Sequence, residues 1–421
     1  MAREMGKSGD RYGSGGSGRS MPDQSGSSSS ISISGEPELN RYDKRTTELG
    51  EGDSGKGSGK GGGNSSIRGG SGKGSGNSSI RGDSGKGGGN SGGSDTSASR
   101  VFDYISKVGV FLIIAVLILI GSFVNKGFLT GANFLNIIQA CAFLGILSAG
   151  MSFITYSGKI VDMSAPITIA ISGIVAVDML TLGLPTALFL GMLSAVAIGL
   201  LNGFVVGKFG ANPIIWTLSV NYLLDGAIRW IYSTSLIYPD TVSAANPEIA
   251  ERFINISRVF ILGAPLPVII MVVMMIAAQL ILTKSTIGVQ LKVIGTNPDV
   301  ARFSGINVTG GVMTAYLLSS VAAGVTGILI SSFSKVGAYY NGVGYDFKAV
   351  TAIVLGGMTL AGGRGSMIGV MGGVFTISLL SNVLTFLGIG TFVQNIINGA
   401  LFIVIVYFNT QSLRKTGKDD A

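Results

Sequence analysis

The chain has 421 residues, of which 47% are apolar and 12% are charged, and its formal net charge is +8. It has no histidine and one cysteine, Cys141, which excludes a disulfide within the chain, metal sites built on histidine or cysteine, and Cys–His nucleophile pairs. Several apolar runs approach the ~20 residues that cross a bilayer. We therefore predict an all-α polytopic membrane protein that needs no cofactor or metal, has no catalytic residues and binds no nucleic acid.

Residues 1–100 are rich in glycine, serine and charged residues, and they hold almost no aromatic or branched apolar side chains. Such a segment cannot bury enough surface to offset its ordering entropy. We predict a disordered cytoplasmic tail, in which basic residues can meet anionic lipid headgroups but acidic residues are interspersed. The stretch 50–57 nearly forms a nucleotide-binding P-loop, yet the Ser or Thr that should follow Lys56 is missing and no strand precedes it.

Residues 101–410 alternate long apolar runs with polar segments, which predicts about ten transmembrane helices. Their expected ranges are 108–124, 134–156, 163–182, 184–206, 213–231, 265–282, 311–333, 347–361, 367–387 and 392–408. The eighth range is short enough to be re-entrant. A short cytoplasmic tail, 411–421, follows the last helix.

The distribution of basic residues orients these helices. With the N-terminus inside, the cytoplasmic side receives Lys159, Lys208, Lys284, Lys292, Arg302, Arg364, Arg414 and Lys415. The outer side receives Lys126, Arg252, Arg258, Lys335 and Lys348. This excess agrees with the positive-inside rule, so we expect a multi-pass inner-membrane protein with both termini and the loop 284–309 in the cytoplasm.

The loop 284–309 contains the signals of a short helix. Asn297 suits the N-cap, Asp299 adds negative charge to the first turn, and Gly305 offers the left-handed residue that ends a helix. These signals predict about two turns, which would carry Arg302 and Phe303 as well. A docking device and a plain solvated loop helix are both open interpretations of this pattern.

Polar residues inside expected spans are costly and usually face a cavity or a partner. Asn221, Asp225 and Arg229 are spaced by four, so they form one stripe on the fifth span. The stripe predicts either a solute pathway with Asp225 paired to Arg229 or a structural ion pair.

Three further residues are candidates for the pathway. Asp162 and Ser164 lie just before the third span, where they could either line the pathway or cap the helix. Trp216 could stack on the face of a sugar.

The two halves of the chain echo each other. Asp162 precedes Gly173 by eleven positions, as Asp346 precedes Gly357, and Asn202 and Asn382 follow later in the two halves. Coincidence in a chain rich in glycine and alanine is the alternative to an internal repeat. A repeat would place the pathway at the interface between the halves.

Three motifs, in this order, carry a resemblance to a known family: LNG at 201–203 followed by NPIIWTL at 212–218, IGTNPDVARFSGIN at 294–307, and GYDFKAVTAIVLGG at 344–357 followed by GGRGS at 362–366. Together they resemble the ribose/xylose-type sugar ABC permeases over most of residues 105–410. Departures at Lys159, Ile160, Pro166, Asp225 and Lys348 mean that the resemblance implies the transporter class and not ribose itself as the solute.

The resemblance implies a permease subunit of an ATP-driven importer. Two permeases, alike or different, would sit on two cytoplasmic ATPase subunits, and an extracytoplasmic binding protein would deliver the solute. The loop 294–307 would then be the ATPase-coupling segment, with contacts from Asn297, Asp299, Arg302 and Gly305 and with Phe303 as apolar anchor.

Two rival functions stay open at this point. The first is a secondary transporter driven by an ion gradient, in which Asp162 and Asp225 would be the proton sites. The second is a membrane scaffold that transports nothing and recruits partners through its basic tail.

Overall fold

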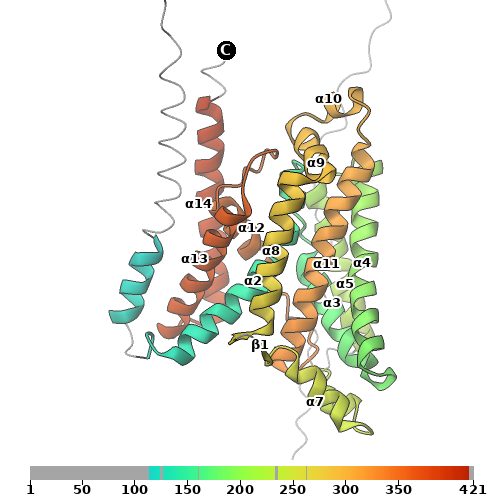
Figure 1. The fold of residues 1–421 in the computed structure, drawn as a ribbon, viewed down its shortest axis with the longest axis vertical. Helices are drawn as coiled ribbons and strands as arrows, with labels where there is room; N and C mark the ends of the chain where they lie inside the picture. The colour runs from blue at the N-terminus through green and yellow to red at the C-terminus, as the bar shows by residue number, and fades with distance from the viewer. Residues whose placement is uncertain (1–112, 124–126, 160, 233–235, 262, 417–421) are drawn as a thin grey trace, which may run out of the picture. The chain divides into compact units, whose positions relative to one another are not determined.

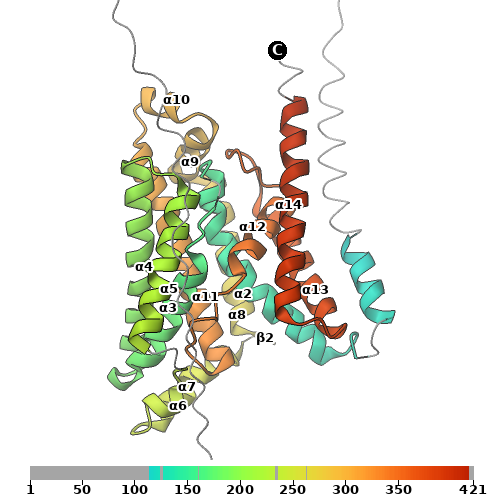
Figure 2. The ribbon, with the colours of Figure 1, turned by 180° about the vertical axis from the view of Figure 1, so that it is seen from behind.

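The computed structural model describes residues 113–416, apart from 124–126, 160, 233–235 and 262. The expected N-terminal tail therefore lies outside the described residues. An apolar helix, Ile113–Phe123, comes first. The elements that follow are α2 (Gly131–Tyr156), α3 (Ala165–Asp178), the 3-10 helix η1 (Met179–Leu182), α4 (Leu184–Lys208), α5 (Pro213–Tyr232), α6 (Pro239–Val242), α7 (Pro247–Asn255), β1 (Phe260–Ile261), β2 (Ala264–Pro265), α8 (Leu266–Lys284), α9 (Thr286–Thr296), α10 (Pro298–Phe303), α11 (Val308–Ser334), α12 (Tyr345–Leu355), α13 (Met367–Phe386) and α14 (Thr391–Thr416) (Figures 1 and 2).

Among the described residues, six helices are long and apolar enough to cross a membrane: α2, α3 with η1, α4, α8, α11 and α13. The expected count of about ten is not confirmed. Helix α5 has 20 residues but is less apolar, because it carries the polar stripe. Helix α12 has 11 residues, or about 16 Å, which is too short for a full span and fits the re-entrant alternative.

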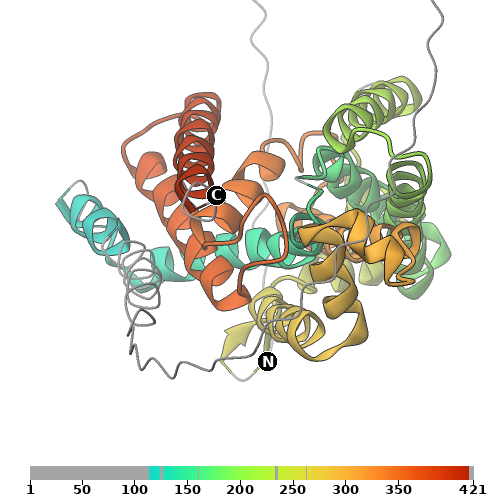
Figure 3. The same ribbon diagram turned by 90° about the horizontal axis from the view of Figure 1, so that it is seen from above.

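Two sets of three helices interlock across the molecule: α2, α3 and α4 form one set, and α11, α12 and α13 form the other. Helix α2 packs against α11 in the opposite direction, since Phe143 meets Phe333 while Gly150 faces Ala322. The first helix of each set also packs on the other set: α11 on α3 and α4, and α2 on α12 and α13. Figure 3 shows the α12–α14 group and the α3–α5 group on opposite sides of α2. An inverted repeat produces this kind of exchange.

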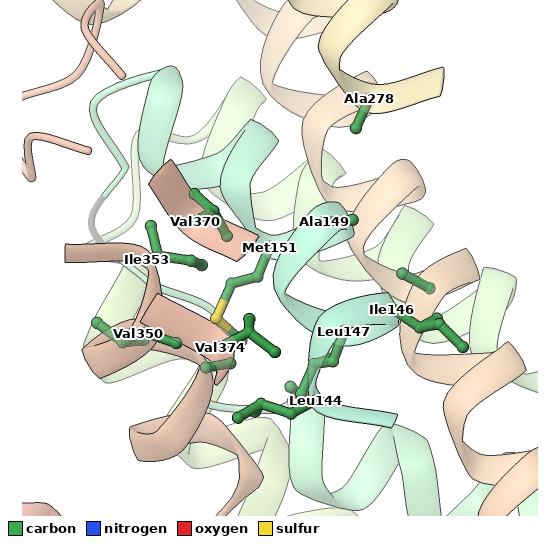
Figure 4. Close-up of a cluster of buried hydrophobic side chains, with 14 of the residues drawn as sticks. Leu144, Ile146, Leu147, Ala149, Met151, Ala278, Val350, Ile353, Val370 and Val374 are labelled. Carbon is green, nitrogen blue, oxygen red and sulfur yellow. The ribbon is translucent and has the colours of Figure 1, made fainter. Parts of the chain in front are cut away.

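The core lies around the second half of α2, which is buried on all sides from Cys141 to Tyr156. The apolar side chains around it come from α2, α8, α12 and α13. Figure 4 shows Leu144, Ile146, Leu147, Ala149, Met151, Ala278, Val350, Ile353, Val370 and Val374. Small residues at the helix crossings let the backbones approach, which is the main means of packing inside a membrane.

The polar segment 236–265 folds over one end of the helices. Helix α7 buries Phe253, and its backbone is held by Ser332, whose Oγ donates to the Phe253 carbonyl oxygen at 2.7 Å. Nearby, the Ser257 Oγ donates to the Leu329 carbonyl oxygen at 2.7 Å. These bonds join the segment to the last turns of α11.

A test of this packing uses the closest crossing of α3 and α11. A Cβ atom at Gly327 would overlap the carbonyl oxygen of Ile169, whereas one at Gly399 in α14 would meet nothing within 4 Å. We expect Gly327→Ala to destabilise the fold by about 1–3 kcal/mol, as overpacking does. Gly399→Ala should leave it unchanged. Thermal unfolding of the two variants in the same detergent checks this, and equal midpoints would contradict the crossing.

Candidate coupling face and solute pathway

Helix α10 forms because its ends are satisfied locally. The Asn297 Oδ1 accepts hydrogen bonds from the backbone N–H groups of Asp299 at 2.9 Å and Val300 at 3.1 Å. Pro298 occupies the first helical position, and Gly305 takes the left-handed conformation, with φ +76°, just beyond the end. The short helix expected from the sequence is therefore present, with six residues.

The outer surface of α10 combines charge with an uncovered aromatic ring. The Arg302 Nη1 lies 3.5 Å from the Asp299 Oδ1, and both side chains are largely exposed. The phenyl ring of Phe303 is 92% exposed, and Val300 is half exposed. A surface of this kind offers both polar and apolar contacts to a partner.

Behind α10, three backbone segments meet without side chains between them. A Cβ atom at Gly295, in the last turn of α9, would overlap the carbonyl oxygen of Tyr156 at the end of α2. The same carbonyl accepts a hydrogen bond from the Gly363 N–H at 2.9 Å. Gly158, Gly362 and Gly363 all have positive φ values, between +71° and +88°. We call these five residues the glycine junction.

The glycine junction ties the α9–α10 loop to both halves of the molecule. Tyr156 and Gly158 open the connection from α2 to α3, and Gly362 and Gly363 lie in the connection from α12 to α13. Because the contacts are between backbones, a displacement of α9 must move the two connections or break them.

A buried chain of hydrogen bonds begins in the connection from α2 to α3. The Ser164 Oγ donates to the Asp162 Oδ1 at 2.6 Å, and the Asn202 Nδ2 donates to the Ser164 Oγ at 2.7 Å. The Trp216 Nε1 donates in turn to the Asn202 Oδ1 at 3.0 Å. This polar chain joins the connection to α4 and α5.

The polar chain brings together three of the predicted pathway residues, Asp162, Ser164 and Trp216. It also assigns Asn202 a central position that the sequence showed only as part of the weak repeat. The Ser164 side chain does not cap α3. Burial of Asp162, Ser164 and Asn202 explains the bonds, because an unpaired polar group at this depth is costly.

Two more polar side chains are buried in the other half of the molecule. The Tyr316 hydroxyl on α11 has no hydrogen-bond partner in the part of the chain that the structure describes. Asp346, the counterpart of Asp162 in the second echoed motif, is buried in the first turn of α12.

The polar stripe of α5 forms a separate group. The Arg229 Nε lies 2.8 Å from the Asp225 Oδ2, and the guanidinium stands over the Tyr339 ring at 4.1 Å from its centroid. The Asn221 Oδ1 is buried, and it has no hydrogen-bond partner within the described ranges. Among described residues, no hydrogen bond or ion pair joins this stripe to the polar chain.

Much of the remaining surface of α5 is apolar and uncovered. Its most exposed large side chains are Ile215, Tyr222, Leu223, Trp230 and Ile231. The stripe and this surface place α5 at the edge of the described helices and not in their core.

Comparison with known proteins supplies the family. The model of the family described as "Branched-chain amino acid transport system / permease component" matches residues 133–406. The ribose import permease protein RbsC of Bacillus subtilis is 32% identical over 302 residues, which cover 71% of this chain and 91% of that protein. No solved structure matches the chain at a comparable level.

Two relatives from Escherichia coli agree. The probable ABC transporter permease protein YphD is 32% identical over 329 residues, covering 78% of this chain and 96% of its own length. The L-arabinose transport system permease protein AraH is 30% identical over 318 residues, covering 75% and 93%. With the apolar helices of the described structure, these matches show that this chain belongs to the family of sugar ABC transporter permeases.

Proposed function

We propose that this chain forms the membrane pathway of an importer for a sugar or a related small polar solute and that a separate ATPase subunit drives it. The observation that carries the proposal is α10, a capped helix with exposed charges and an exposed phenyl ring. It directly follows the last turn of α9, whose Gly295 backbone contacts both halves of the helical core. Hydrolysis of ATP takes place in the partner, and α10 of this chain receives the movement of that partner.

The ATPase binds the face that carries α10. Phe303 enters an apolar pocket of the partner, and Asp299 and Arg302 fix the orientation of the helix through complementary charges. Helix α14 ends on the same side as α10 (Figures 1 and 2), in keeping with a cytoplasmic C-terminus. Lys208 and Lys284, at the ends of α4 and α8, support the same orientation.

A second permease, identical or related, covers the uncovered surface of α5. This contact buries apolar side chains such as Tyr222 and Leu223 and brings Asp225 and Arg229 of the two subunits toward each other. The binding protein delivers the solute on the side opposite α10.

We infer that transport follows from movement of α10. When the ATPases close, they displace α10, and the glycine junction passes the displacement to the connections before α3 and after α12. The polar chain then carries it to α4 and α5 through Asn202 and Trp216. The pathway opens to one side of the membrane and closes to the other.

The charges of α10 separate a docking role from a structural one. Asp299→Lys or Arg302→Glu alone breaks the ion pair between them, whereas the double variant restores a pair with inverted polarity. We expect the double variant to insert normally but to take up solute about tenfold more slowly than wild type, the effect of losing ~1.4 kcal/mol of contact.

The measurement is uptake in cells together with the amount of inserted permease. If the ATPase contacts these charges directly, solute uptake stays slow in both single variants and in the double variant. If the double variant recovers the wild-type rate while the single variants do not, the pair only stabilises the helix and the ATPase does not read its charges.

The glycine junction gives a matched pair of substitutions. Gly363 and Gly388 have similar positive φ values, +71° and +74°. A Cβ atom at Gly363 would lie 2.6 Å from the Thr296 Oγ1, whereas one at Gly388 would meet nothing within 4 Å. Both alanine variants bear the same left-handed cost of about 1–2 kcal/mol. Only Gly363→Ala also puts a methyl group into the junction, where it meets the last turn of α9.

We expect Gly363→Ala to transport less solute per ATP hydrolysed in the reconstituted complex, while Gly388→Ala keeps the wild-type ratio. The ratio is the decisive quantity, because a merely unstable protein loses transport and coupled hydrolysis together. Equal ratios for the two variants and the wild type would show that the junction does not transmit the movement.

A further inference from the structure

A half-open cavity of about 320 Å³ lies where the two interlocked sets cross, apart from the polar chain and from the α5 stripe. Its lining residues come from α2, α11 and the first turn of α12; they are Asn136, Gln139, Ala140, Phe143, Ile330, Phe333 and Tyr345. The volume is at the lower end of the range of about 300–1,000 Å³ for small-molecule sites, so the cavity suits a ligand of few atoms.

The lining combines aromatic rings with free amides. The rings of Phe143 and Phe333 lie 5.6 Å apart between centroids, and Tyr345 adds a third ring. Asn136 and Gln139 are one turn apart on the same face of α2. In the described part of the chain, no hydrogen bond engages either side-chain amide. Each amide can therefore both donate to and accept from a ligand.

The lining contains no charged side chain. The ammonium group of Lys348 lies 5.9 Å from the centroid of the Tyr345 ring and is no part of the lining. A zwitterionic amino acid would find no carboxylate here for its ammonium group. A neutral molecule with several hydroxyl groups would find donors, acceptors and ring faces.

The position of the cavity is as informative as its lining. Phe143 lies on α2 and Phe333 lies on α11, and each of these helices packs against the other set of three. Tyr345 is the first residue of the short helix α12. In transporters built from repeats, solute sites lie at the interface between the repeats and at the ends of interrupted helices.

We propose that this cavity binds the transported solute, and that the solute is a neutral, monosaccharide-sized molecule held by Asn136, Gln139 and the three aromatic rings. The inference rests on the proposed function and adds to it the site and the charge class of the solute. Sugar hydroxyls bond the amides, and the C–H face of the ring packs on Phe333 and Tyr345.

Alkylation of an introduced cysteine tests the site without relying on transport activity. Ala140 is exposed and lines the cavity, while Ala132 is exposed on the same helix outside it. The A140C and A132C variants are made in a Cys141→Ser background, which removes the native thiol. Both are assembled with the ATPase and the binding protein and treated with a maleimide. The probe is whichever of D-ribose, L-arabinose and D-glucose the wild-type transporter accumulates, and L-leucine is the comparison.

We expect the accumulated sugar to slow labelling of A140C, by about tenfold at ten times its dissociation constant, and to leave A132C unaffected. L-Leucine should protect neither. Sugar uptake without protection of A140C overturns the site and leaves the proposed function standing. Protection by L-leucine and not by sugar overturns the neutral charge class. If the wild type accumulates L-leucine and none of the three sugars, the proposed function fails and the site falls with it.

Uptake by a matched pair of α2 variants completes the test. Gln139→Ala removes an amide from the lining, and Leu135→Ala removes a partly exposed side chain outside it. We expect sugar uptake to fall about tenfold for Gln139→Ala, the cost of one hydrogen bond to a solute, and to stay at the wild-type rate for Leu135→Ala. Equal rates in the two variants, at equal amounts of inserted protein, would overturn the role of the amide.

Discussion

The contact on which the rest depends is the approach of the Gly295 backbone to the Tyr156 carbonyl, with the Gly363 N–H bonded to the same oxygen. No side chain larger than hydrogen fits at Gly295. If α10 were connected to the helical core through flexible side chains, changes of rotamer would absorb part of its movement. Direct contacts between backbones are stiffer and transmit more of it. The junction therefore explains how a six-residue helix at the edge of the protein can act on a core of long helices.

The core itself must be able to shift without exposing polar groups to lipid. The polar chain satisfies this condition, since Asp162, Ser164 and Asn202 each find partners while fully buried. Hydrogen bonds can re-form after a small displacement in a way that tightly interlocked apolar packing cannot. The Tyr316 hydroxyl, which has no hydrogen-bond partner among the described residues, is a further buried donor in this core.

Local signals in the sequence predicted local structure well. Asn297, Asp299 and Gly305 specify α10 through contacts within a few residues, so the helix and its ends were predictable. The long apolar runs likewise predicted most of the helices. Whether the eighth run spans the membrane or is re-entrant could not be predicted, because apolar composition does not say where a helix stops. In the structure the two glycines after Leu355 stop it, and Gly357 takes φ +85°.

Contacts between distant segments were not predictable in this way. The glycine junction joins residues more than one hundred positions apart, and glycine spacing alone is equally compatible with a turn or a helix crossing. Asn202 stood out only as part of a weak repeat, because its partners Ser164 and Trp216 lie on other elements. The cavity between α2, α11 and α12 left no sequence signal, since its residues are ordinary for an apolar helix.

Cross-linking from the end of α10 tests the central claim most directly. A photoreactive amino acid at position 303, incorporated in cells that are taking up solute, should attach the permease to a chain that binds and hydrolyses ATP. This ATPase should be the main cross-linked partner. Uptake that continues after ATP depletion, with no ATPase attached at position 303, would contradict it.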